Sequence, residues 1–398
     1  MNKIDLKHDK AFILISLFVL FALSLFVQSA FSSKHSLLLI IGAALGYALL
    51  HAAFGFSSAW RNFIRTQHSR GFRSHILLIS LTSILFFPLI GQLFPDIQTS
   101  AALAPVSVSV LVGAFLFGIG MQLGSGCGSG TLYTVGGGHV NMLITLSFFI
   151  IGATIGSVHL PWWLTLPSAG KISIIETFGW LPSLVSQLVV LSLIYLALKQ
   201  IEQRRHGHVQ PLLSKESSRP FLDTFLFGPW PLWWAVIVLT LLNLTTLLIA
   251  GHPWTITFAF GLWGTKVWQA VGGDISGWHY WSQGYPAAAL NQSLLNDTTS
   301  LMDIGLVVGA VLAASLAGSF APDKKVSRQL ILVSVIGGLL LGYGARLAFG
   351  CNIGGLLAGM ATGSLHGWLW LVAGFSGATA GVYLRIWMKM DKPLRSSE

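Results

Sequence analysis

The chain has 398 residues, of which 54% are hydrophobic and only 9% are charged. Because this composition offers too little polar surface to cover a soluble body of that size, it excludes a soluble protein and indicates an integral membrane protein. The net charge of +10 implies no nucleic-acid partner, since basic residues gathered between apolar segments are the usual mark of membrane topology.

Ten apolar runs follow one another along the chain, and each is long enough to cross a hydrocarbon core of about 30 Å. They are 11–30, 36–53, 75–93, 106–123, 143–160, 174–198, 232–250, 301–320, 330–349 and 365–388. The runs are apolar on all faces, so they lack the two-residue alternation of a membrane-spanning barrel. The predicted fold is therefore an all-α integral membrane protein with about ten transmembrane helices in the lipid bilayer.

Basic residues predict the orientation of these helices. Five clusters of Lys and Arg lie at 3–10, 61–73, 199–219, 324–328 and 389–395. With ten crossings, all five clusters fall on one side of the membrane, which the positive-inside rule identifies as the cytoplasm. Both termini are therefore expected to be cytoplasmic.

A tract in the first half of the chain returns in the second half. Residues 118–132 align with residues 342–356 at a shift of 224, and seven of fifteen positions are identical, including Cys127 and Cys351, the only two cysteines. The runs before these cysteines cross in opposite directions, so we predict two inverted repeats, as in many transporters. The expected order is a peripheral N-terminal helix, a first repeat half, a cytoplasmic linker and a second repeat half, at 1–34, 35–199, 200–229 and 230–398.

Glycines crowd the chain around each cysteine and are expected to break the helix there. Irregular backbone at membrane depth is tolerated where it is buried in protein or lines a cavity. We predict short re-entrant half-helices at 128–135 and 352–361, each beginning directly after a cysteine. Their amide-rich N-termini carry partial positive charge and would suit an anion.

The predicted site centres on the two cysteines. Arg346 lies five residues before Cys351 inside an apolar run, and its counterpart in the first half is Gln122. An intramembrane arginine is a functional candidate because its burial is costly, although a position near the membrane surface would let it snorkel. The neighbours of the cysteines complete the candidate substrate-binding set, namely Gly126, Gly128, Gly350 and Asn352.

Three further residues are secondary candidates, namely His139, His366 and Lys266. Single histidines at helix junctions are more often interfacial hydrogen-bonding groups than ligands. Tryptophans around Lys266 favour an interfacial position with a snorkelling side chain. Asp303 stands alone at a predicted helix start, where it is expected to act as a capping charge.

No catalytic triad, metal-ligand spacing or phosphate loop can be assembled from the sequence, so no enzyme, metal or cofactor is expected. The two cysteines leave other interpretations open. A buried free cysteine often serves as a small hydrophobe. Two cysteines could also cycle between dithiol and disulfide in a membrane redox protein.

The tract at 342–353, which contains Gly350-Cys351-Asn352, and the segment at 364–368 that follows it resemble the signature of the YeeE/YedE family of bacterial inner-membrane proteins. The resemblance implies uptake of a small sulfur-containing anion, thiosulfate in the best understood members. In those proteins, cysteines along a central path pass the anion onward through S–H···S hydrogen bonds. Cys127 and Cys351 match two of these relay cysteines, and the third is missing here.

Together these observations predict a permease that takes up a thiosulfate-like anion from the periplasm. Cys127 and Cys351 would contact its terminal sulfur, while Arg346, Gln122 and the half-helix amides would hold its negative charge. YedE-type members, which the second half resembles most, imply a selenium-compound transporter as an alternative, and a membrane thiol redox protein is another. A cytoplasmic sulfur-carrier protein is a further expected partner, docking on the basic linker at 199–219.

Overall fold

The computed structural model of the protein describes residues 9–212, 220–320 and 326–392. Ten segments of this described part are helical, long and apolar enough to cross a membrane, which confirms the predicted all-α membrane fold. The first half contains α1 (Asp9–Ala30), α2 (Ser33–Ala52), α3 (Phe56–Thr66), α4 (Arg70–Ile90), β1 (Pro105–Ser107), α5 (Val108–Leu123), α6 (Gly128–Gly136), α7 (Val140–Trp163), β2 (Ser168–Lys171), α8 (Ile174–Phe178) and α9 (Trp180–His206). The second half contains α10 (Phe221–Phe227), α11 (Leu232–Ala250), α12 (Thr257–Ala270), η1 (His279–Trp281), α13 (Gly284–Leu290), η2 (Leu294–Asn296), α14 (Thr298–Leu316), α15 (Arg328–Leu347), η3 (Asn352–Leu357), α16 (Ala358–Ala361) and α17 (Leu365–Trp387).

The described residues form one two-stranded sheet, made of β1 and β2. The two strands are antiparallel, with Pro105 opposite Lys171. An isolated bridge between Ser173 and Ser364 continues beside them. The loop after α7 is thereby tied to the start of α5 and to the start of α17.

Glycines allow the inner helices to pack with their backbones in contact. Between α2 and α14, a Cβ atom on Gly46 would overlap the carbonyl oxygen of Leu306, and one on Gly309 would overlap that of Ala43. The same close approach joins α5 to α15 and to α17. Small residues at such crossings are a common means of helix association in membranes. The interior of the bundle is therefore tight where these helices cross.

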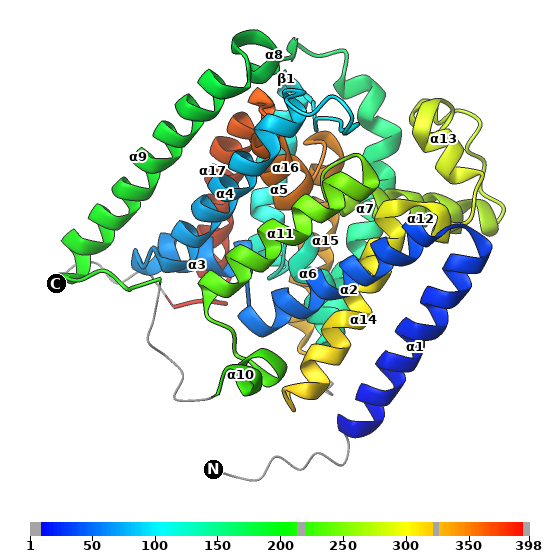
Figure 1. Ribbon diagram of the computed structural model, residues 1–398, viewed down its shortest axis with the longest axis horizontal. Coiled ribbons are helices and arrows are strands. Elements are labelled where there is room, and N and C mark those ends of the chain that lie inside the picture. The colour runs from blue at the N-terminus through cyan, green and yellow to red at the C-terminus, as the bar shows by residue number, and fades with distance from the viewer. Residues whose placement is uncertain (1–8, 213–219, 321–325, 393–398) are drawn as a thin grey trace.

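Two long helices lie outside this interior. Figure 1 shows α1 and α9 on opposite sides of the molecule, with α5, α6, α15 and α16 between them. Large apolar side chains on both outer helices are exposed, for example Phe18 on α1 and Leu193 on α9. Such surfaces suit contact with lipid. The half-helices that follow the cysteines, by contrast, are mostly buried within the bundle.

Candidate functional site

Two spanning helices are broken just before a cysteine. Helix α5 ends at Leu123 and α6 begins at Gly128, while α15 ends at Leu347 and η3 begins at Asn352. Two residues before each cysteine the backbone is left-handed, with φ of 62° at Ser125 and 57° at Phe349. Left-handed backbone is rare for residues other than glycine, and here it reverses the chain between helix segments.

The second half-helix begins with π-helical backbone, whereas the first is α-helical as the sequence predicts. The carbonyl of Cys351 accepts hydrogen bonds from the amides of Gly355 at 2.8 Å and Leu356 at 3.3 Å. The Nε1 of Trp370 also donates to the carbonyl of Gly350 at 3.1 Å. These contacts widen and anchor the first turn, and π-helical turns are frequent at functional sites.

Each cysteine caps the helix that follows it. The sulfur of Cys127 accepts a hydrogen bond from the amide of Gly130 at 3.4 Å, and that of Cys351 accepts one from Ile353 at 3.4 Å. Both thiols are free and buried. A Cβ atom on Gly128 would lie only 2.9 Å from the sulfur of Cys351. The structure therefore brings the second thiol against the residue that follows the first cysteine.

Arg346 is buried among aromatic side chains. Its Nη1 donates to the hydroxyl of Tyr280 at 2.6 Å, and its guanidinium lies 4.8 Å from the centre of that ring and 5.9 Å from the ring of Phe258. Its Nε and Nη2 atoms have no hydrogen-bond partner among the described residues. A guanidinium carries five N–H donors, so the donors on these two buried nitrogens are unused in this structure. Burial within the protein also argues against a snorkelling side chain.

A cavity of about 190 Å³ lies at this guanidinium. We call it the Arg346 cavity; it is lined by Leu160, Thr255, Thr257, Phe258, Tyr280, Ala345, Arg346, Phe349, Gly350 and Gly354. Gly350 and Gly354 flank Cys351 along the chain. A small anion in the cavity would therefore meet both a positive charge and the approach to a thiol.

Gln122 has a different environment from its counterpart Arg346. Its Oε1 accepts a hydrogen bond from Nε of Arg61 at 2.9 Å, and its Nε2 donates to the carbonyl of Ser57 at 3.3 Å. Its own carbonyl accepts from Arg61 at 2.9 Å and from Arg385 at 3.0 Å. The side chain that was expected to hold the substrate is thus engaged by Arg61 and Ser57, and the backbone carbonyl of Gln122 binds two guanidinium groups.

Asp391 closes this group of arginines. Its carboxylate accepts hydrogen bonds from Arg385 at 2.8 and 3.2 Å, and it lies 3.4 Å from Arg65. The hydrogen bonds from Arg385 lower the pKa of Asp391 below its ordinary value of 3.8. We call Arg61, Gln122, Arg385 and Asp391 the Gln122 cluster. Asp391 offsets one of these positive charges, so the cluster keeps a net positive charge.

The remaining neighbours of the cysteines are buried with them. Both polar atoms of the Asn352 side chain are without a hydrogen-bond partner among the described residues, which leaves an amide available at the start of η3. A Cβ atom on Gly126 would lie 2.9 Å from the hydroxyl of Thr131, and one on Gly350 would overlap the amide of Gly355. These two glycines therefore permit the tight turns that carry the cysteines.

The secondary candidates lie apart from the two thiols. His139 is exposed at the start of α7, and Lys266 donates to the carbonyls of Leu290 at 2.7 Å and Gln292 at 2.6 Å. His366 is buried behind the second half-helix, where its Nδ1 is 2.6 Å from the hydroxyl of Ser364. None of the three lines the Arg346 cavity.

The expectation that Asp303 caps a helix is wrong. Helix α14 begins at Thr298, and its cap is Asp297, whose carboxylate accepts a hydrogen bond from the amide of Ser300 at 2.7 Å. Asp303 lies farther along the helix and is fully buried. Neither of its carboxyl oxygens has a hydrogen-bond partner among the described residues.

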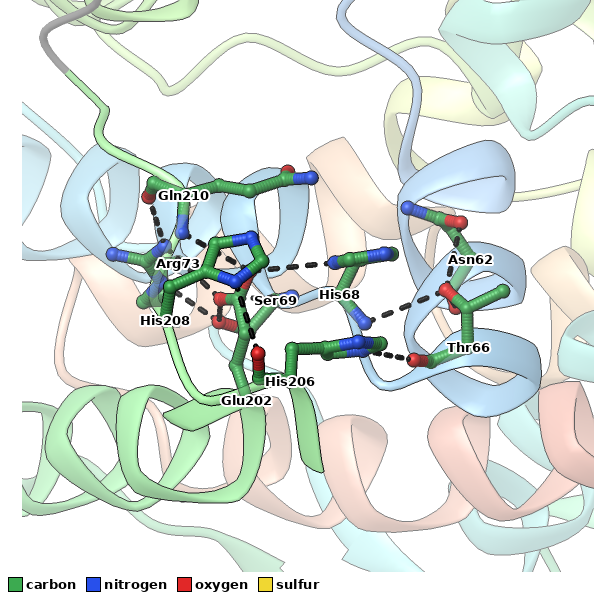
Figure 2. A network of polar contacts seen from close by, with 9 residues as sticks. All are labelled: Asn62, Thr66, His68, Ser69, Arg73, Glu202, His206, His208 and Gln210. Atoms are coloured by element: carbon green, nitrogen blue, oxygen red, sulfur yellow. Dashed lines mark hydrogen bonds and ion pairs between the residues drawn. The ribbon is translucent and has the colours of Figure 1, made fainter. Parts of the chain in front are cut away.

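The start of the basic linker is held by a polar network, which Figure 2 shows. Glu202 near the end of α9 pairs with Arg73 at 3.2 Å and accepts a hydrogen bond from the amide of Gln210 at 3.2 Å. The rings of His68 and His206 are stacked with their centres 4.0 Å apart. Among the described residues, no three His, Cys, Asp or Glu side chains are grouped to hold a metal. This network anchors α9 to α4.

Sequence reasoning missed three polar residues of the site, namely Tyr280, Arg61 and Arg385. Arg385 lies inside the last apolar run, and the rule that singled out Arg346 could have found it. Arg61 was read only as a marker of orientation. Tyr280 comes from a loop between α12 and α14 and has no local signal.

Comparison with known proteins bears on this arrangement. Residues 51–380 match the protein family described as sulphur transport, in agreement with the resemblance seen in the sequence. The thiosulfate transporter TsuA of Escherichia coli is 27% identical over 382 residues, which cover 90% of this chain and 96% of that protein. The thiosulfate transporter TsuA of Spirochaeta thermophila is 27% identical over 347 residues, covering 83% and 93%. The probable transporter YedE of Escherichia coli is 31% identical over 182 residues, which are 44% of each chain.

Proposed function

Since the chain belongs to the sulphur transport family, we propose that it is an inner-membrane permease that takes up a thiosulfate-like anion past Cys127 and Cys351. Relatives named as thiosulfate transporters match nearly their whole length, which supports this substrate class. The observation that carries the proposal is the Arg346 cavity, where a guanidinium with unused donors lies beside the turn that carries a buried thiol.

The two chemical ends of thiosulfate suit the two kinds of group in this place. Its oxygen atoms carry charge that a guanidinium binds through strong hydrogen bonds. Its terminal sulfur is soft and accepts a weak hydrogen bond from a thiol. Arg346 would therefore receive the anion, and Cys351 would take its sulfur end. The unpaired amide of Asn352 would add a neutral donor at the same depth.

The anion would then pass from the second thiol to the first. Gly128 leaves the sulfur of Cys351 close to the turn at Cys127, so a short movement would exchange one thiol partner for the other. Beyond Cys127 lies the Gln122 cluster, where Arg61 and Arg385 offer positive charge. On this proposal the two arginines receive the anion after Asp391 has released Arg385.

The distribution of basic residues supports the direction of uptake. Arg61, Arg65 and Arg385 lie at the Gln122 cluster, together with Asp391 from the end of the described chain. If this is the cytoplasmic side, both termini are inside and the Arg346 cavity opens toward the periplasm. Equivalent positions in the two halves then face opposite sides, as inverted repeats require.

A cytoplasmic sulfur-carrier protein stays a predicted partner. The proposed docking segment at 199–219 includes residues 213–219, which lie outside the described residues. Its first part is anchored through Glu202 and Gln210, so a partner would meet an ordered start to the linker. Loss of uptake on replacing Arg204 and Arg205 by Gln would support docking.

Uptake of radiolabelled thiosulfate tests the two thiols. We expect Cys127→Ala and Cys351→Ala each to reduce uptake by about tenfold or more, because each removes a hydrogen-bond partner of the passing sulfur. Ser315→Ala is a matched control, since it removes one buried polar atom from α14 away from the cysteines. Undiminished uptake in both cysteine variants would contradict the relay.

The same assay separates the alternatives. A selenium analogue that competes better than thiosulfate at equal concentration would move the substrate assignment to selenium compounds. A redox protein would instead yield a purified chain whose mass falls by two hydrogen atoms when a mild oxidant joins the two thiols in a disulfide, with no uptake of either anion.

A further inference from the structure

Asp303 is a buried carboxyl group that the proposed path does not use. It lies within the spanning segment Thr298–Leu316, it has no exposed surface, and both of its oxygens are without a hydrogen-bond partner among the described residues. An ionised carboxylate in such a place is very unfavourable, whereas the protonated acid is tolerated. Intramembrane carboxyls of this kind mark ion and proton pathways.

The geometry of α14 directs Asp303 toward the first half-helix. A Cβ atom on Gly136 of α6 would lie 2.8 Å from the carbonyl of Val307 and 3.2 Å from the amide of Val311. Asp303 comes one turn before Val307, so it projects from the same face of α14. Its side chain therefore faces α6, on the part that leads back to Cys127.

Helix α6 links Asp303 to both cysteines. Cys127 caps the start of α6, the thiol of Cys351 contacts Gly128 in its first turn, and α14, which carries Asp303, packs against the same helix. The two thiols and this carboxyl therefore all border one half-helix. A change in the charge of the carboxyl would act on α6, which begins where the proposed anion would change partners.

Few other titratable groups face this carboxyl. Helix α2 packs against α14 through its apolar tract at 39–46, and α1 contributes Lys10 only at its far end. Helix α6 contributes Tyr133, and α10 contributes Asp223 near the opposite end of α14.

Two charged groups lie near the start of α14. Asp297 accepts a hydrogen bond from the amide of Ser300 and another from Tyr285 at 2.6 Å. Lys266 of α12 is bound to the carbonyls of Leu290 and Gln292. No cation among the described residues pairs with Asp303, so a proton is the simplest counterion.

We propose that Asp303 binds a proton and couples its inward movement to uptake of the anion, an inference that rests on the proposed function. The carboxylate would take one proton from the periplasmic side, and the neutral acid would allow a negative substrate to pass the thiols. After the anion leaves, the acid would release the proton to the cytoplasmic side. One proton moves with each anion, and no covalent bond between heavy atoms changes.

Coupling anion uptake to proton entry would help the anion to enter against the membrane potential. The membrane potential is negative inside, and it opposes the uptake of an anion in proportion to the anion's charge. A co-transported proton reduces the net negative charge that moves inward. It also adds the free energy of the pH gradient to the driving force.

The experiment uses the full-length protein in liposomes, with the membrane potential held at zero and the outside more acidic. Wild-type protein should accumulate labelled thiosulfate by about tenfold per unit of pH difference, because one proton accompanies each anion. Asp303→Asn should still exchange labelled for unlabelled thiosulfate, since the thiols and Arg346 are intact, but it should not accumulate it. Asp303→Glu should restore part of the accumulation.

Asp274→Asn is the matched control, because Asp274 is an exposed acid in the loop after α12, and it should accumulate thiosulfate like the wild type. Accumulation by Asp303→Asn at the wild-type level would overturn the coupling role. So would wild-type protein that exchanges thiosulfate but responds to no pH gradient, or responds only to sodium, and that result would leave the proposed function standing. Wild-type protein without any exchange would overturn both proposals.

Discussion

The two helix breaks of this protein have similar backbone conformations, but the polar contacts around them differ. Arg346 and Gln122 each lie five residues before a cysteine, and left-handed backbone follows each of them at Phe349 and Ser125. Arg346 makes one hydrogen bond and lines a cavity. The side chain of Gln122 is bound by Arg61 and Ser57, and its carbonyl is bound by Arg61 and Arg385. One end therefore has a guanidinium with unused donors, whereas the guanidiniums at the other end are already bound to groups of the chain.

On the proposed function, this difference would give the two ends of the path different affinities for the anion. An anion at the Arg346 cavity would find a guanidinium with free donors, which favours binding. At the Gln122 cluster the same anion would compete with the carboxylate of Asp391 for Arg385. A site that must compete for its charges binds weakly and releases readily. Similar repeats can thus serve as a receiving end and a releasing end.

The largest expected effect comes from making the two ends alike. Arg346→Gln places at the receiving end the residue that its counterpart position already carries. Because a hydrogen bond to a charged group contributes about 1.5–3 kcal/mol, the apparent affinity for thiosulfate should fall by about tenfold to a hundredfold. The concentration dependence of labelled uptake measures this change.

Two further variants serve as comparisons for Arg346→Gln. Tyr280→Phe removes one neutral partner of the guanidinium and should weaken affinity by about fivefold, the effect of roughly 1 kcal/mol. Arg328→Gln changes an exposed arginine at the start of the same helix and should leave uptake unchanged. An Arg346→Gln protein with wild-type affinity would show that the cavity does not receive the anion.

The spanning helices and the two helix breaks could be predicted from the sequence, because they depend on residues that are close together along the chain. The lengths of the apolar runs determine the ten spans. The glycines near Cys127 and Cys351 break the helices at the predicted places, and the half-helices begin at Gly128 and Asn352 as expected. Each of these features is determined by residues that are neighbours in the sequence.

The surroundings of the two ends could not be predicted, because they arise between distant segments. Tyr280 reaches Arg346 across 66 residues of sequence, and Arg385 reaches Gln122 across 263. Asp303 was misread because the start of α14 depends on Asp297, six residues earlier, where the side chain caps the helix. Tertiary contacts and the exact helix start therefore decide which polar groups stay unpaired.

A smaller effect on uptake is expected where the two half-helices meet, at the contact between Gly128 and the sulfur of Cys351. A methyl group at Gly128 would lie 2.9 Å from the sulfur of Cys351, whereas one at Gly277 would have no other atom within 4 Å. Gly128→Ala should displace the thiol and lower the rate of thiosulfate uptake by about tenfold, because displacements of about 1 Å have effects of this size or larger. Gly277→Ala is the matched control and should stay within about twofold of the wild type.

Equal uptake rates for the two alanine variants would show that the position of the Cys351 thiol does not affect transport. A reduced amount of Gly128→Ala protein in the membrane would confuse the comparison, so uptake is divided by the quantity of protein measured in the same vesicles. Thiol accessibility to a small alkylating reagent adds a second readout. The reactivity of Cys351 should change in Gly128→Ala and not in Gly277→Ala.

The smallest effect is expected at the releasing end and appears in stability. Arg385 lowers the pKa of Asp391, so the ionised pair stabilises the folded protein above pH 3.8, the ordinary value, and this contribution is lost as pH falls through the lowered pKa. Asp391→Asn should therefore reduce the free energy of unfolding by about 0.5–1 kcal/mol at pH 7. Thermal unfolding followed by tryptophan fluorescence should show the gap to the wild type closing below pH 3.8. The exposed Asp96→Asn should show no gap at pH 7, and an Asp391→Asn gap that persists unchanged in acid would mean that Asp391 does not hold the arginines by its charge.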